Sequence, residues 1–391
     1  MNRKDFLKTS SLAVAGLSLP FGCSKDDNPV APVEQSELPP FPYLEVSGTN
    51  YDVGKKTGEF FKPIFEENFR RQNETIQFIV GLADSEPDKY FNPFYNAAIE
   101  HFPEYIDELK GMADGIGIPF RTVMCFNLIM EIMIRHATSG GNIPIKIPHF
   151  GCSDISYSSS TRTIMAHNED FDKKMADLMY VVKVSVPGKP TFIGLNYPGL
   201  IFGIPPGMNE AGLVETGNFI SSLEVNDSAP WMFLARSILD KENLTDAVAA
   251  LKLPSGYAEH YQVGSFTENK IHAVEFTTGA SESKELNGFY VHTNHLILPT
   301  MLNLPQSPDG TTYARYEILS AYAEEYKNKI DQVNPDKMVS WLSNHDGYPN
   351  YVCTHSENAQ TVSSSIFDFQ DKSWRLYKGN PCYGYYKTLR F

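Results

Sequence analysis

The stretch PHFGCSDI, residues 148–155, places a glycine directly before a cysteine and follows that cysteine with a strand-like run. The chain has five cysteines in 391 residues, too few for a disulfide scaffold. A cysteine becomes a strong nucleophile when a base stands beside its thiol. If the chain is cut between Gly151 and Cys152, the freed α-amine, which titrates near pH ~8, supplies that base. The alternative reading of the dipeptide is an ordinary turn with a buried core thiol.

Four further residues fit a nucleophile at Cys152. Asp170 ends the run IMAHNED eighteen positions later, a spacing that brings its carboxylate back beside Cys152 if the two segments form a hairpin. Asn218 and Asn294 each end an apolar run, and an Asn amide can stabilise an oxyanion. Arg315, in TYARYEIL, can orient a carboxylate through a bidentate contact.

The two sides of this cysteine differ in pattern. Residues 43 to about 140 have the apolar periodicity of helices, as in GEFFKPIFEENF and PEYIDELKGMADGIGIP. After a Gly/Ser/Asn/Pro-rich stretch at 139–148, short β-rich runs dominate, interrupted by predicted helices at 231–251 and 313–329. The pattern predicts an α+β fold in which helices cover sheets.

The first residues predict export. Residues 1–22 combine a basic start with a short apolar run, which is typical of a signal peptide and too short to span a membrane. The run ends in a lipobox-like Gly22-Cys23, so we expect lipid attachment at Cys23 and a Pro-rich tether over 23–42. This predicts an outer-membrane or periplasmic lipoprotein of a Gram-negative bacterium, with plain secretion as the alternative.

Charge and the remaining polar residues narrow the function classes. The formal net charge of −14 and the lack of a Lys/Arg block argue against a nucleic-acid partner. His292 and His295 form an H-x-x-H pair, but positions three apart on a strand point to opposite faces, so we predict no metal and no cofactor. Cys353 and Cys382 either form a disulfide or remain free thiols.

From about Leu44 to its end, the chain resembles the acyl-coenzyme A:6-aminopenicillanic acid acyltransferase-like family of N-terminal nucleophile hydrolases (isopenicillin N acyltransferase, peptidase C45). The resemblance implies a four-layer αββα fold, with a helical pro-segment over 43–151 and a catalytic chain over 152–391. The motifs that carry it are SGTNYDVGKKTGEFF, FPEYIDELKGMADGIGIPF, GCSDI, AHNEDFD, HTNHL and the closing DGYPNYVCTHS, TVSSSIFDF and GNPC.

The resemblance also implies roles for the site residues. Cys152 would be the nucleophile and new N-terminus, Asp170 would orient its amine, Asn294 would donate to the oxyanion, and Arg315 would support them. The more distant choloylglycine and penicillin V hydrolases suggest Asn218 as a second oxyanion donor. These relatives carry Arg where this chain has His167, which argues against bile-salt substrates.

The predicted function is therefore a self-cleaving cysteine amidohydrolase or acyltransferase that acts on linear amides of small molecules through a thioester. The two chains produced by cleavage would stay associated, and a membrane would be contacted only through the lipid anchor. One alternative is a surface lipoprotein without enzymatic activity that binds peptide or glycan. A second is a metallohydrolase that uses His292 or His295.

Overall fold

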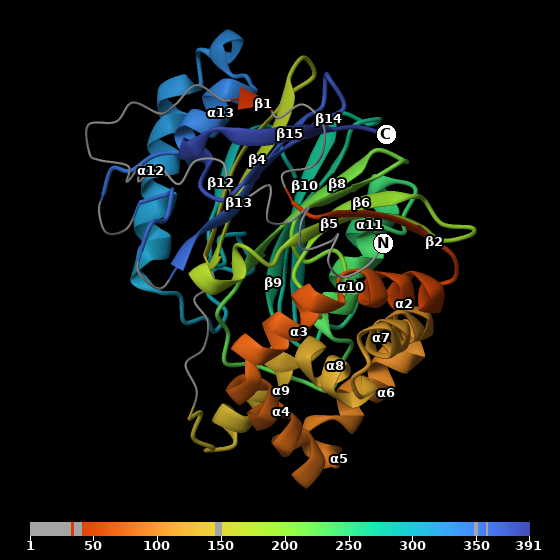
Figure 1. Ribbon diagram of the computed structural model, residues 1–391. Coiled ribbons are helices and arrows are strands. Elements are labelled where there is room, and N and C mark those ends of the chain that lie inside the picture. Colours follow the sequence, from red (N-terminus) through yellow and green to blue (C-terminus); the bar gives the residue numbers. More distant parts are fainter. Residues whose placement is uncertain (1–32, 35–40, 145–150, 348–350, 357–358) are drawn as a thin grey trace.

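Two β-sheets lie face to face between two layers of helices (Figure 1). The structure, a computed structural model, describes residues 33–34, 41–144, 151–347, 351–356 and 359–391. The predicted signal peptide and Cys23 lie outside these residues. No helix within the described ranges combines the length and apolar composition that crossing a membrane requires.

Among the described residues, one sheet has seven strands and the other has eight. Neighbouring strands are antiparallel except at one edge of each sheet, where β1 pairs with β15 and β2 with β5 in parallel. The seven-stranded sheet has the order β1 (Val33–Glu34), β15 (Tyr385–Leu389), β14 (Ser373–Lys378), β13 (Ala359–Asp368), β4 (Thr163–Asp172), β3 (Gly151–Ser158), β12 (Gly288–His292). The eight-stranded sheet has the order β11 (Ser281–Glu285), β10 (Lys270–Phe276), β9 (Glu259–Ser265), β8 (Leu213–Phe219), β7 (Gly207–Asn209), β6 (Phe192–Asn196), β5 (Tyr180–Ser185), β2 (Tyr43–Ser47).

The helices form two groups, one on each outer face (Figure 1). Helices α12 (Gly310–Tyr326) and α13 (Pro335–Leu342) cover the seven-stranded sheet. The larger group covers the eight-stranded sheet. It comprises α2 (Asn50–Phe60), α3 (Lys62–Arg71), α4 (Asn73–Ser85), α5 (Pro87–Tyr90), α6 (Asn92–His101), α7 (Pro103–Ile116), α8 (Phe120–Asn127), α9 (Ile129–Thr138), α10 (Trp231–Ile238) and α11 (Leu244–Ala250).

Strand alternation explains why four layers form. In β5, Tyr180 and Val182 pack into the core beneath the larger helical group, whereas Val181 faces the core between the sheets. In β4, Met165 joins the core between the sheets, and Ala166 packs under α12 and α13. Each of these strands therefore buries apolar side chains on both faces, as sheets in the middle of a layered fold must.

Helices α2 and α7 pack with their backbones in close contact. A Cβ atom placed on Gly54 would lie 2.0 Å from the carbonyl oxygen of Glu108, and one on Gly111 would lie 2.0 Å from that of Tyr51. Only glycine permits this approach. Helix α7 then ends at Gly117, which adopts φ +86° in the left-handed region.

The structure corrects several of the expected boundaries. Val33–Glu34 of the predicted tether forms β1, and Tyr43–Ser47 of the predicted helical pro-segment forms β2, an edge strand of the eight-stranded sheet. The segments before and after Cys152 thus share one sheet. The helix predicted over 231–251 is interrupted because Asn243 accepts the backbone N–H of Asp246 and starts α11 as a new helix.

Candidate active site

Cys152 is the second residue of β3, and its exposed fraction is only 3%. Strands β3 and β4 form the hairpin that the sequence spacing predicts, with Gly151 opposite Asp170 and Cys152 opposite Glu169. Residues opposite each other in a hairpin point to the same face of the sheet. The thiol of Cys152 therefore shares a face with Glu169, and the carboxylate of Asp170 shares the other face with Gly151.

Asp170 is held by two threonine hydroxyls on that other face. Thr361 donates to its Oδ1 at 2.6 Å, and Thr354 donates to its Oδ2 at 3.0 Å. The exposed fraction of Asp170 is 1%. The structure thus positions a buried carboxylate beside the Gly151–Cys152 bond, one residue away from the thiol that it was expected to neighbour.

Asn294 and Arg315 hold the backbone of Cys152. The backbone N–H of Cys152 donates to Asn294 Oδ1 at 2.9 Å, and Arg315 Nη2 donates to the same oxygen at 2.7 Å. Arg315 Nη1 also donates to the carbonyl of Cys152 and, at 2.8 Å, to Ser153 Oγ. Because a guanidinium can only donate, the Asn294 amide turns its oxygen toward it. Asn294 Nδ2 instead donates to the carbonyl of Phe219 at 3.0 Å.

Asn218 lies in β8, and its side chain is completely buried. The Asn218 Oδ1 atom lies 3.1 Å from Nδ1 of His260. Its Nδ2 atom has no hydrogen-bond partner in the part of the chain that the structure describes. An unpaired buried donor costs about 1–3 kcal/mol. A buried donor without a partner calls for an explanation, and a bound water or a catalytic role are two of them.

His167 is a buried imidazole between two carboxylates. Its Nδ1 lies 2.8 Å from Asp154 Oδ1, and its Nε2 lies 3.0 Å from Glu169 Oε2. Burial alone would lower the pKa of His167, but the charges of Asp154 and Glu169 outweigh it and raise the pKa to about 9. At neutral pH His167 is therefore an imidazolium whose two N–H groups are both engaged.

The sequence indicates His167 only as a replacement for Arg, and this charged cluster was not predicted from it. Its signal was the alternation of His167 and Glu169 on one strand, which places both side chains on the same face. One ring nitrogen of His167, one carboxylate oxygen of Glu169 and the sulfur of Cys152 lie within 4.8 Å of one another. Tyr197 completes the arrangement by donating to Glu169 Oε1 at 2.8 Å.

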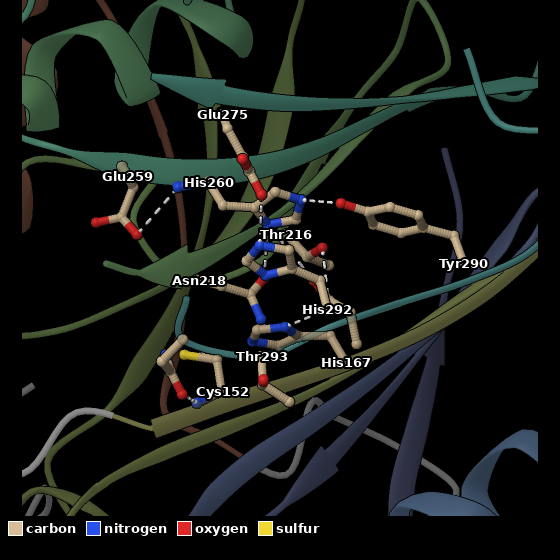
Figure 2. Close-up of polar contacts among 12 residues, drawn as sticks. Cys152, His167, Thr216, Asn218, Glu259, His260, Glu275, Tyr290, His292 and Thr293 are labelled. Atoms are coloured by element: carbon tan, nitrogen blue, oxygen red, sulfur yellow. Dashed lines mark hydrogen bonds and ion pairs between the residues drawn. The ribbon is translucent and has the colours of Figure 1, made fainter. Parts of the chain in front are cut away.

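Two further buried histidines, His260 and His292, continue the polar contacts between the sheets (Figure 2). The rings of His260 and His292 stack with centroids 3.5 Å apart. Burial, reinforced by His292 and His167, holds the pKa of His260 well below its usual range. His292 Nε2 lies 3.1 Å from Glu275 Oε1, so its ring faces a carboxylate of the neighbouring sheet.

The expected geometry of the H-x-x-H pair was wrong. The rings of His292 and His295 face each other, with centroids 6.4 Å apart, rather than pointing to opposite faces. Strand β12 ends at His292, so the alternation of a strand does not extend to His295. The two side chains contact different groups: His292 contacts Glu275, and His295 Nδ1 lies 3.1 Å from Thr312 Oγ1.

An apolar pocket opens at Cys152. It encloses about 760 Å³ including its opening to solvent, a size suited to a small molecule.

Burial, together with the charges of Glu169 and Asp170, raises the pKa of the Cys152 thiol well above its usual value, so the thiol is protonated. Two carboxylates, Glu169 and Glu259, interrupt the apolar wall. Aromatic lining comes from Phe126, Phe171, Tyr197, Phe219, Trp231 and Tyr261.

Comparison with known proteins identifies the family. The family model described as acyl-coenzyme A:6-aminopenicillanic acid acyl-transferase matches residues 158–383, more than half of the chain. The chain belongs to this family. It has the four-layer fold of N-terminal nucleophile hydrolases and is an enzyme that acts on carbon–nitrogen amide bonds. The match includes Asp170, Asn218, Asn294 and Arg315 but begins after Cys152.

Individual relatives share limited identity with the chain. The β-alanyl-dopamine/carcinine hydrolase of Drosophila melanogaster is 25% identical over 377 residues, covering 87% of this chain and 93% of the relative. A variant of conjugated bile acid hydrolase from Clostridium perfringens has a TM-score of 0.43 at 14% identity, covering 58% of this chain and 89% of its own. Penicillin V acylase from Agrobacterium tumefaciens has a TM-score of 0.35 at 13% identity, and the match covers 58% of this chain and 82% of the acylase.

Proposed function

We propose that the chain cuts itself between Gly151 and Cys152 and then transfers acyl groups from amide substrates through a thioester on Cys152. The observation that carries this proposal is the engagement of both His167 nitrogens by carboxylates. An imidazolium with a pKa of about 9 has no lone pair with which to accept a proton from the nearby thiol. The α-nitrogen of Cys152 is then the base of choice, and it becomes basic only after cleavage.

The cleavage step needs a nucleophile, a carbonyl and a positioned leaving nitrogen. The Cys152 sulfur attacks the carbonyl carbon of Gly151, the Gly151–Cys152 C–N bond breaks, and the nitrogen leaves with a proton as the α-amine. Water then hydrolyses the resulting thioester and leaves a carboxylate on Gly151. The hydrogen bond from the Cys152 N–H to Asn294, together with the Arg315 contacts, supports the positioning of that nitrogen.

Turnover would repeat the same chemistry on an amide substrate. The α-amine takes the thiol proton, the sulfur attacks the substrate carbonyl, and the departing amine receives a proton from the α-ammonium. The buried, unpartnered Nδ2 of Asn218 supports its role as an oxyanion donor. For Asn294, the same role requires its amide to turn over after cleavage, because its oxygen faces Cys152 in the uncut chain.

The pocket favours a substrate that carries an ammonium group. Glu259 lines the pocket with Cys152, its exposed fraction is 2%, and its Oε2 has no hydrogen-bond partner among the described residues. Burial raises the pKa of Glu259 well above its usual value, so a bound cation would restore its charge. The Drosophila relative is named for β-alanyl-dopamine and carcinine, which supports an acyl group that ends in a primary amine.

Export and lipid attachment at Cys23 remain part of the proposal, on the sequence pattern of residues 1–23. The pairing of β2 with β5 supports continued association of the two chains after cleavage, because β2 precedes the cut and β5 follows it. Acyl-chain labelling of the wild type and of Cys23→Ala tests the anchor. We expect the labelled acyl chain to be found on the wild type and not on Cys23→Ala. Equal labelling of the two proteins would contradict the lipid anchor.

The Cys152→Ala variant tests the enzymatic proposal. It removes the sulfur, so we expect one uncut chain and a loss of amidase activity of at least about 10⁴-fold. Cys125→Ala is the matched control, since Cys125 is buried in helix α8. We expect the control to mature and to retain activity. Cleavage of Cys152→Ala at the same bond would overturn the proposal, and a wild-type chain that never matures would favour a binding protein instead.

A further inference from the structure

Four side chains away from Cys152 converge on one point. His345 follows helix α13, Cys353 and His355 precede strand β13, and Cys382 lies in the short 3₁₀ helix η3 (Pro381–Tyr383). One nitrogen or sulfur atom from each side chain lies within 4.8 Å of the other three. Cys353 and Cys382 are buried, whereas the two histidines are partly exposed.

The distances among these atoms match the edges of a tetrahedron around zinc. Zn–S bonds of about 2.3 Å and Zn–N bonds of about 2.05 Å at tetrahedral angles give edges of about 3.8 Å for S···S, 3.6 Å for S···N and 3.4 Å for N···N. The two sulfur atoms of Cys353 and Cys382 lie 3.8 Å apart, and they lie 3.3 and 3.4 Å from Nε2 of His355. The Nε2 atoms of His345 and His355 lie 3.3 Å apart.

A disulfide explains this arrangement less well. The sulfur atoms of Cys353 and Cys382 lie 3.8 Å apart, well beyond the bond length of a disulfide. A disulfide would use the two sulfur atoms and give no reason for His345 and His355 to direct their Nε2 atoms at each other. A bound cation gives that reason, because each nitrogen then directs a lone pair at the ion.

We propose that His345, Cys353, His355 and Cys382 bind one structural Zn²⁺. A tetrahedral set of two sulfur and two nitrogen ligands is characteristic of structural zinc sites, and two thiolates balance the charge of the ion. Asn380 Nδ2 lies 3.4 Å from Cys353 Sγ, as a donor that supports a thiolate would. With four protein ligands the site has no open position for a substrate, so its role is structural.

The ion would also steady the candidate active site. Thr354 stands between the ligands Cys353 and His355, and its hydroxyl donates to Asp170 at 3.0 Å. Asp170 pairs with Gly151 across the β3–β4 hairpin. By fixing the chain on both sides of Thr354, the ion would hold the Asp170 carboxylate beside the Gly151–Cys152 bond. The metal site itself stands whether or not that bond is cut.

Metal analysis of the full-length chain, purified without chelator, tests the proposal. We expect inductively coupled plasma mass spectrometry to find about one zinc ion per chain. Replacement of zinc by Co²⁺ should give the visible bands of a tetrahedral ion and a thiolate-to-cobalt charge-transfer band. The Cys353→Ser/Cys382→Ser variant should lose the ion, whereas Cys125→Ser and Cys152→Ala should keep it. If the double variant does not fold, the cobalt spectrum of the wild type still decides.

Four results would overturn the proposed metal site. The first is a wild-type chain that carries no zinc and takes up no Co²⁺ with these bands. The second is a folded double variant that retains the ion. The third is a Cys353–Cys382 disulfide, found by non-reducing peptide mapping of the chain from an exporting host. The fourth is loss of the ion from Cys152→Ala, which would instead place it at the group formed by Cys152, His167 and Glu169.

Discussion

The part of the chain that the structure describes holds two compact groups of cysteine and histidine side chains, which differ in what their imidazoles face. In the group around Cys152, carboxylates of Asp154 and Glu169 engage both nitrogens of His167. In the C-terminal group of His345, Cys353, His355 and Cys382, the imidazole nitrogens face sulfur atoms and each other. The first arrangement fixes an imidazolium, which cannot accept the proton of the Cys152 thiol. The second leaves lone pairs directed at one point, where a metal ion fits.

The difference shows that the residue types alone do not decide the chemistry. Two carboxylates make His167 a fixed cation: Glu169 lies two residues further along β4, and Asp154 lies opposite His167 on β3. Among the four atoms of the C-terminal group there is no carboxylate. The two groups therefore answer to different perturbations: metal content reports on the C-terminal group, and turnover and the pH dependence of stability report on the group around Cys152.

The largest effect is expected from removal of the metal. Extraction of zinc with a strong chelator should lower the midpoint temperature of unfolding by about 10 °C, because structural zinc sites contribute several kcal/mol of folding free energy. Differential scanning calorimetry measures the change. Uncut Cys152→Ala should show the same drop, and Cys353→Ser/Cys382→Ser should show none. If zinc extraction lowered the midpoint temperature only in chains that retain Cys152, the metal would lie at Cys152 and the two groups would not differ as described.

Removal of the unpartnered amide at Asn218 affects the other group. We expect Asn218→Ala to lower kcat by about 10²–10³-fold, the usual loss for one oxyanion donor. Steady-state kinetics of the matured form measures this change, and zinc content should stay at the wild-type value. A variant with full kcat would remove Asn218 from the oxyanion site.

The charged state of His167 predicts a pH dependence of stability. Its pKa is raised to about 9 in the fold from about 6.5 in the unfolded chain, so the fold binds the additional proton between these values. The resulting stability is fully present below pH 6.5 and is lost as the pH rises through 9. It amounts to on the order of 3 kcal/mol.

Urea unfolding of the uncut Cys152→Ala chain at pH 6.5 and pH 9.5 measures this term without interference from self-cleavage. Adding Glu169→Gln removes one of the two charges that raise the pKa of His167, so the loss of stability between the two pH values should shrink. A loss that is identical with and without Glu169→Gln would show that His167 is not clamped as described.

The smallest effect concerns substrate choice. Glu259→Gln should reduce the preference for a β-alanyl amide over the matching butanoyl amide by about 10–100-fold in kcat/KM, because a hydrogen-bonded charge pair contributes about 1.5–3 kcal/mol. Turnover of the butanoyl amide should change little in Glu259→Gln. This control distinguishes a loss of ammonium recognition from a variant that does not fold. If the wild type turned over both amides equally well, the proposal of an ammonium-bearing substrate would be wrong, whereas the assignment of Cys152 as nucleophile would stand.

The sequence predicted what depends on local spacing. The eighteen-residue separation of Cys152 and Asp170 predicted the β3–β4 hairpin, and the change of periodicity near residue 140 predicted the boundary between the helical and β-rich parts. Short edge strands escaped this reasoning, since the two residues of β1 carry no alternation and gain their place by pairing with β15 near the other end of the chain.

The sequence could not predict contacts that the sheets create. Asn294 was expected to donate to an oxyanion, but Arg315 from helix α12 turns its oxygen toward Cys152. The C-terminal Cys/His group has no standard zinc spacing, since Cys382 follows His355 by 27 positions. Strands β13 and β14 lie between these two residues, and their pairing returns the chain to the same point.

The most direct test of the proposed chemistry is the intact mass of the purified wild-type chain, with sequencing of every new N-terminus. We predict two associated polypeptides, of which the larger begins at Cys152 with an unmodified amino group. An active protein in which residues 151 and 152 are still joined would contradict it, because the α-nitrogen could then never accept the proton of its own thiol.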